Sequence, residues 1–130
     1  MQASDGTVGG EPKAWLRAEG LVAFALSTAL YFAVGAPVWL YFVLILAPDL
    51  AMFGYLGGPK LGATAYNLAH SYAGPAVLAV IGVLTTSAAF GVALIWTAHI
   101  GLDRLLGYGL KYPAAFGHTH LGMVGRKQTD

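Results

Sequence analysis

The sequence predicts an all-α fold: a four-helix transmembrane bundle with short turns and a C-terminal tail that is extramembrane or lies on the membrane surface. Apolar side chains make up 57% of the 130 residues and charged ones only 10%, a composition unlike that of small water-soluble domains. The apolar stretches are long enough for crossings of roughly 20 residues each. The charged side chains gather in the first nineteen and the last five residues, except for Asp49, Lys60, Asp103, Arg104 and Lys111.

Three regions follow from this pattern: a polar lead over residues 1–14, a transmembrane domain over 15–106 and an interfacial tail over 107–130. The apolar stretch after Lys13 and Arg17 has the position of a signal peptide. Its polar lead and its length, which suffices to span a bilayer, favour a first helix that stays in the mature chain.

The first span is predicted from about Trp15 or Gly20 to Gly35, followed by a very short turn that ends at Pro37. The second span then runs from Pro37 to about Leu56, because proline is well tolerated at the first position of a helix. A loop over residues 57–60, Gly-Gly-Pro-Lys, closes it.

The third and fourth spans share the apolar run from Leu61 to Leu106, which is too long for one crossing and long enough for two. We place the division between Leu84 and Ser87. Pro75 falls inside the third span, where loss of a backbone hydrogen bond could kink the helix.

The Lys and Arg residues predict the orientation, since cytoplasmic flanks collect basic side chains. With four crossings, the N-terminus, the loop at Lys60 and the tail share one side of the membrane, and these three places hold every Lys and Arg. Both termini are therefore expected in the cytoplasm.

Four ionisable side chains interrupt the apolar spans: Asp49, His70, His99 and Asp103. Such groups are costly in hydrocarbon and usually mark function. With a rise of about 1.5 Å per residue, all four fall in the cytoplasmic half of the membrane, on three different helices. We therefore expect them to converge on one pocket.

The spacing of these residues suits ligands. His99 and Asp103 are four residues apart and share a helix face, and Asn67 precedes His70 by three residues. Two imidazoles and two carboxylates could bind zinc, iron or manganese, or could pass protons. The absence of Cys excludes thiolate sites.

Structural roles explain the same residues. His99 and Asp103 could form a satisfied pair that braces Arg104, His70 and Asn67 could fix helix packing, and Asp49 could cap a helix that restarts after proline. In the tail, His118 and His120 could add metal ligands, although a solvated turn is favoured. Arg104 and Lys111 lie where anionic lipid or phosphate would be bound.

Several strings resemble a family of small bacterial membrane proteins, the domain of unknown function 4260: APDL (47–50), GATAYNLAH (62–70), AHIGLDRLLGYGLK (98–111) and FGHTHLG (116–122). The resemblance implies a multi-pass protein of the bacterial inner (cell) membrane and covers roughly residues 15–125.

A weaker pattern is similar to inner-membrane metal-dependent hydrolases related to the LexA-binding membrane protein. That likeness implies that Asp49, His70, His99 and Asp103 are the metal ligands. The chain has NLAHS at 67–71 where that group has a His-Arg-x-x-Thr-His-Ser string.

The leading hypothesis is a metal-dependent hydrolase whose site faces the cytoplasmic leaflet, with a divalent ion such as zinc, manganese or iron. The alternative is a noncatalytic subunit or packing partner of a larger membrane complex. Expected partners are membrane lipids and either such a complex or further copies of this chain. A net charge of +1 without a basic stripe excludes nucleic acid as an expected partner.

Overall fold

The computed structural model describes residues 9–110, 118–119 and 122–123. Its elements are α1 (Gly10–Ala33), α2 (Val38–Leu44), a 3₁₀ helix η1 (Ala47–Gly57), α3 (Pro59–His70), α4 (Ala73–Leu84), α5 (Ser87–Leu106), β1 (His118–Thr119) and β2 (Gly122–Met123). The two short strands pair antiparallel. Apart from these strands, the described residues are mostly helical, as the sequence predicts.

Among the described residues, three helical segments are long and apolar enough to cross a membrane: α1, the α2–η1 segment Val38–Gly57, and α5. The helices α3 and α4 qualify as a fourth span if they are counted together, with a bend of 41° between them. These segments indicate a membrane protein. The predicted division at Leu84–Ser87 is confirmed, since α4 ends and α5 begins at these residues and the Thr86 hydroxyl caps α5 by accepting a bond from the Ala89 N–H.

The second span differs from the prediction because it is not one α-helix. It breaks after Leu44 and continues as η1. Pro48 has no N–H to donate, and the next N–H, that of Asp49, bonds to the Leu46 carbonyl three residues back, at 3.1 Å. The Ile45 carbonyl, which an α-helix would pair with Asp49, thereby becomes available for another donor.

The third span breaks earlier than its proline. Pro75 lies in the first turn of α4, where a missing N–H costs nothing, and the break falls at Ser71–Tyr72. The carbonyls that end α3 find donors on α5: Trp96 Nε1 donates to Ala69 at 2.5 Å, and Arg104 Nη2 donates to His70 at 3.2 Å. Side chains far along the sequence thus cap this helix.

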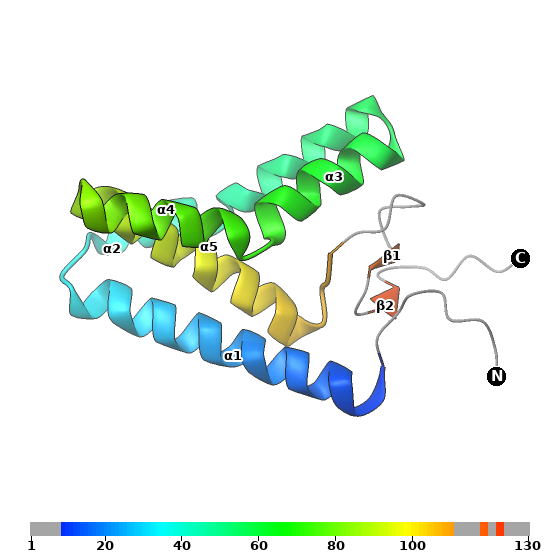
Figure 1. The fold of residues 1–130 in the computed structure, drawn as a ribbon, viewed down its shortest axis with the longest axis horizontal. Coiled ribbons are helices and arrows are strands. Elements are labelled where there is room, and N and C mark those ends of the chain that lie inside the picture. Colours follow the sequence, from blue (N-terminus) through cyan, green and yellow to red (C-terminus); the bar gives the residue numbers. More distant parts are fainter. Residues whose placement is uncertain (1–8, 111–117, 120–121, 124–130) are drawn as a thin grey trace, which may run out of the picture.

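The helices gather around α5 (Figure 1). There, α1 and α5 run side by side in opposite directions, α4 covers another side of α5, and α3 leans away from the others together with η1, against which it packs. At the crossing of α1 and α5 the backbones nearly touch: a Cβ added to Gly101 would lie 2.6 Å from Phe24 N and 2.7 Å from Gly20 O.

A small core lies between α1, α2 and α5, formed by Tyr31, Tyr41, Leu94, Ile95 and Ala98. Both tyrosine hydroxyls are satisfied, that of Tyr31 by donating to the Pro37 carbonyl at 2.6 Å and that of Tyr41 by pairing with Thr28 at 2.8 Å. Most other large apolar side chains are exposed, as expected of residues that face lipid.

Candidate functional site

Asp49, His70, His99 and Asp103 meet in one cluster, as the sequence predicts. The two imidazole Nε2 atoms are 3.1 Å apart. Asp49 Oδ1 lies 3.0 Å from His70 Nε2 and 3.2 Å from His99 Nε2, and Asp103 Oδ2 lies 3.5 Å and 3.2 Å from the same two nitrogens. One ligand atom from each residue can be chosen so that all four lie within 4.8 Å of one another.

Two of the four cluster residues lie at the two helix breaks. Asp49 is in the first turn of η1, just after the second span changes its helical form, and His70 is the last residue of α3. His99 and Asp103 share one face of the unbroken helix α5. Irregular backbone at membrane depth is tolerated where protein buries it, so both breaks lie against α5.

Each imidazole is held through its Nδ1 atom by a backbone carbonyl. His70 Nδ1 donates to Tyr66 O at 2.9 Å, and His99 Nδ1 donates to Ile45 O at 2.5 Å. A carbonyl can only accept, so Nδ1 carries the proton and the neutral ring presents Nε2 as an acceptor. The carbonyl of Ile45 is the one left without its helical partner, since the Asp49 N–H bonds to Leu46 instead.

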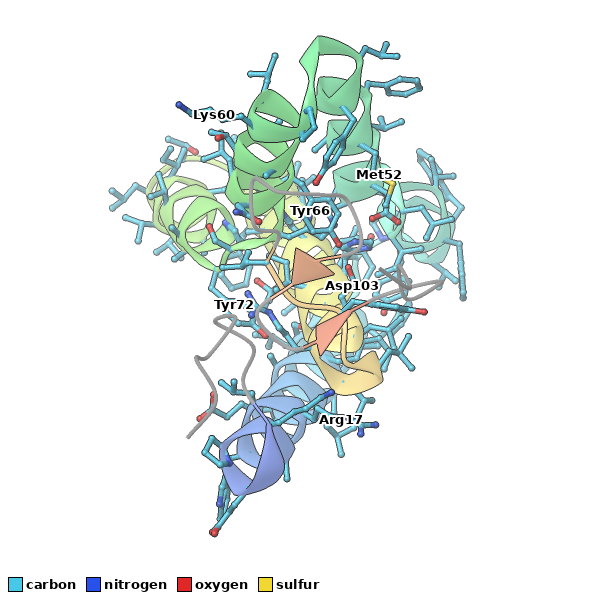
Figure 2. The ribbon with its side chains drawn as sticks, turned by 90° about the vertical axis from the view of Figure 1, so that its right-hand side faces the viewer. Arg17, Met52, Lys60, Tyr66, Tyr72 and Asp103 are labelled. Atoms are coloured by element: carbon cyan, nitrogen blue, oxygen red, sulfur yellow. The ribbon has the colours of Figure 1, made fainter. Side chains whose placement is uncertain are left out.

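The cluster is enclosed on its histidine side and open on its carboxylate side. Both histidines are 3% exposed, whereas Asp103 is 18% and Asp49 is 35% exposed. The Tyr66 ring stacks on the His70 ring with centroids 3.7 Å apart and planes 7° from parallel. Figure 2 shows the molecule from the right-hand side of Figure 1, with Asp103 near the middle of the view.

The distances suit a bound cation. A tetrahedral zinc ion with bonds of about 2.0–2.1 Å separates its ligand atoms by about 3.3–3.4 Å. Five of the six separations between the four ligand atoms run from 3.0 to 3.5 Å, and the sixth, between the two carboxylate oxygens, is at most 4.8 Å. The cluster is therefore a buried group that could hold a metal ion.

Of the accessory residues predicted from the sequence, the structure describes the side chains of Asn67 and Arg104. Arg104 caps α3 at the His70 carbonyl, and its guanidinium carbon lies 5.8 Å from the centre of the Tyr72 ring. Asn67 lies on α3, one turn before His70. Lys111 and His120 are outside the described residues, and for His118 the structure describes the strand but not the side chain.

The proposed cap at Asp49 is not observed, because η1 has no side-chain cap and the carboxylate turns to the histidines instead. Sequence reasoning missed the carbonyl of Ile45 as the anchor of His99. Pro48 was the available signal, since a proline in a helix frees carbonyls in the turn before it.

Comparison with known families supports the first resemblance. The family model described as "Domain of unknown function (DUF4260)" matches residues 13–124. The chain belongs to this family. The match includes all four residues of the cluster and every described helix, apart from the first three residues of α1. No curated protein and no solved structure matches the chain. The likeness to metal-dependent hydrolases stays a prediction.

Proposed function

We propose that this protein is an integral membrane metalloenzyme in which Asp49, His70, His99 and Asp103 bind one divalent ion for hydrolysis. One observation carries the proposal: four acceptor atoms converge while both Nδ1 donors are committed to backbone carbonyls. Acceptors at such distances repel one another unless a cation lies between them. Two neutral imidazoles and two carboxylates carry a charge of −2, which a divalent ion neutralises.

Protonation is the competing way to satisfy the cluster. A second proton on one histidine would let its Nε2–H donate to the other Nε2 or to a carboxylate, but it would leave the cluster with a charge of −1. A second proton on each histidine would set two N–H groups face to face across 3.1 Å. A single ion satisfies all four groups at once. Zinc, manganese and iron each accept such a mixed nitrogen and oxygen set.

Hydrolysis is the chemistry that such a centre supports best. A bound divalent ion brings the pKa of its water near neutrality and polarises a carbonyl or phosphoryl oxygen. Asp49 is the most exposed ligand, so water and substrate would reach the ion on that side. Arg104, beside His70, would neutralise an anionic group of the substrate.

The site would face the cytoplasmic leaflet of the bacterial inner membrane, with both termini in the cytoplasm. In support, Arg17 at the start of α1 donates to the Leu105 carbonyl at the end of α5, so these basic ends lie together. Lys60 begins α3 at the same end of the bundle (Figures 1 and 2). Basic flanks on one side follow the positive-inside rule.

Metal content tests the proposal. We expect about one zinc, manganese or iron ion per chain in protein purified in mild detergent, and loss of most of it in Asp103→Asn, which keeps the shape of the side chain. Glu19→Gln, an exposed acid on α1, is the matched control and should keep the metal. The metal-loaded protein should hydrolyse ester or phosphoester substrates, and a chelator should abolish this activity. Equal, near-zero occupancy in all three proteins after reloading would end the proposal.

The second candidate is a noncatalytic subunit of a larger complex or of a homo-oligomer. The cluster itself favours it to a degree, because Asp49 of η1 contacts both His70 of α3 and His99 of α5, and these contacts could hold the three elements together without a metal. Mild-detergent extraction followed by sizing should then give an assembly larger than one chain. A chain that always runs alone would count against this candidate.

A further inference from the structure

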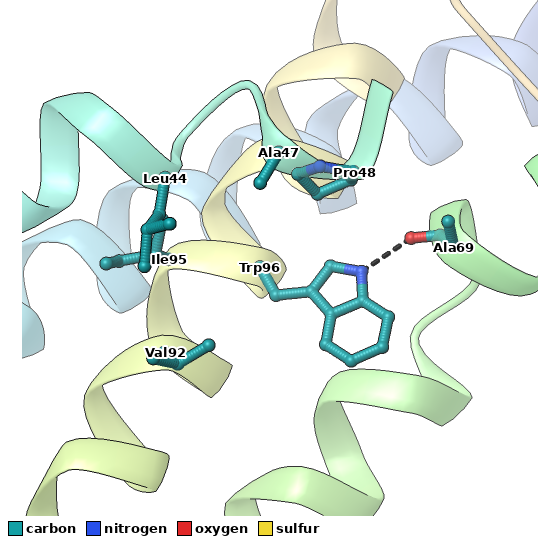
Figure 3. Close-up of a pocket in the computed structure, with 7 residues that line it drawn as sticks. All are labelled: Leu44, Ala47, Pro48, Ala69, Val92, Ile95 and Trp96. Carbon is teal, nitrogen blue, oxygen red and sulfur yellow. Dashed lines mark hydrogen bonds between the residues drawn. The ribbon is translucent and has the colours of Figure 1, made fainter. Parts of the chain in front are cut away.

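An apolar pocket lies beside the metal-ligand cluster (Figure 3). Its volume is about 230 Å³, and its walls come from α2, η1, α3 and α5. Its lining includes Ala47, Pro48, Ala69, Val92 and Trp96.

The described side chains that line this pocket offer it no polar group. The only polar side-chain atom among them, Trp96 Nε1, donates to the Ala69 carbonyl at 2.5 Å, as the dashed line in Figure 3 shows. The indole is fixed from its other end as well, because a Cβ added to Gly74 would lie 2.5 Å from the ring. The pocket is therefore a fixed hydrocarbon-lined space and excludes polar ligands.

Three of the four elements that line the pocket also carry residues of the cluster, close by in the sequence. Ala69 precedes His70, Pro48 precedes Asp49, and Trp96 is one turn before His99. Along α5, the pocket residues occupy the middle of the helix and the cluster residues lie nearer its C-terminal end. If α5 spans the bilayer, the apolar space lies at the interior of the membrane and the polar cluster lies toward its surface.

We infer that this pocket holds the acyl chain of a lipid-like substrate whose ester or phosphoester head lies at the metal centre. The inference rests on the proposed function and names its substrate class. A lipid of one leaflet has its chain toward the interior and its head toward the surface, which is the order of pocket and cluster along α5. The positive charge of Arg104 favours an anionic head.

The size of the pocket selects among lipids. Pockets for drug-sized ligands run from roughly 300 to 1,000 Å³, so a space of 230 Å³ accommodates part of one chain rather than two chains or a fused ring. A single-chain anionic lipid is the substrate class that fits best.

Photolabelling tests the inference. The probe is lysophosphatidic acid with a diazirine in its acyl chain, applied to the purified full-length chain in detergent micelles, and the labelled peptides are mapped by mass spectrometry. We expect saturable labelling of the part of α5 between Val92 and Trp96, displaced by unlabelled lysophosphatidic acid. Val92→Phe and Ala47→Leu fill the pocket from opposite walls. Each should raise at least tenfold the concentration of unlabelled lysophosphatidic acid that displaces half of the probe. Val83→Phe, on an exposed face of α4 where Val83 is 72% exposed, should leave it unchanged.

The outcomes separate this inference from the proposed function. Labelling that does not saturate, or that is equal in the two pocket variants and in Val83→Phe, overturns the inference even if one metal ion is bound. Saturable labelling in a chain that binds no metal supports the lipid pocket and contradicts the proposed hydrolase function. Unfolding of each pocket variant by SDS, followed by circular dichroism, separates misfolding from loss of the pocket: a variant that is folded as stably as Val83→Phe and still loses labelling has lost the pocket.

Discussion

The contact between α1 and α5 makes a quantitative prediction for Gly101→Ala. The added methyl group would lie 2.6 Å from Phe24 N, about 0.8 Å short of the 3.4 Å at which ordinary contact begins, and the obstacle is backbone that cannot rotate away. Overpacking of this kind costs about 1–3 kcal/mol. Gly91→Ala is the matched control on the same helix, since its methyl group would meet only Tyr31, at 3.4 Å.

Both variants gain the same helix propensity of about 1 kcal/mol from replacing glycine, so this gain cancels in their difference. We therefore expect Gly101→Ala to unfold with a free energy about 1–3 kcal/mol lower than Gly91→Ala. The assay is reversible unfolding by SDS in mixed micelles, followed by circular dichroism. If Gly101→Ala is as stable as Gly91→Ala, the backbones of α1 and α5 do not meet at this glycine.

Two further predictions concern the helix breaks. Pro48→Ala restores an N–H to the second span and lets backbone donors of the helix compete with His99 for the Ile45 carbonyl. Metal affinity, measured by competition with a chelating dye, should therefore fall about 10–100-fold. Unchanged affinity would show that this carbonyl does not orient the His99 ring. Trp96→Phe removes the donor to the Ala69 carbonyl and should lower the free energy of unfolding by about 0.5–1.5 kcal/mol in the same SDS assay. Wild-type stability would mean that the bond from Trp96 to Ala69 does not stabilise the end of α3.

The positions of the membrane spans and of the cluster could be predicted because both depend on local composition. Long apolar runs set the spans, and ionisable residues within them are rare enough to single out Asp49, His70, His99 and Asp103. The division at Leu84–Ser87 followed from length alone. Convergence of the four followed from their similar depths on three helices.

The helix breaks could be predicted only in part: Pro48 signals the first one, but the hydrogen bonds that take up the freed carbonyls come from residues distant in the sequence. The third span breaks after His70 rather than at Pro75, and Trp96 and Arg104 on α5 supply donors for the last carbonyls of α3. The second span changes its helical form where His99 takes the Ile45 carbonyl. Tertiary hydrogen bonds thus decide where these helices stop, and a sequence pattern does not display them.

X-ray absorption at the edge of the bound metal in purified protein tests the metal centre itself. We expect one ion with two imidazole nitrogens and at least two carboxylate oxygens at about 2.0–2.2 Å, and loss of one imidazole contribution in His99→Gln. A spectrum with only water oxygens around the ion, or one unchanged in His99→Gln, would mean that these four residues do not bind the metal.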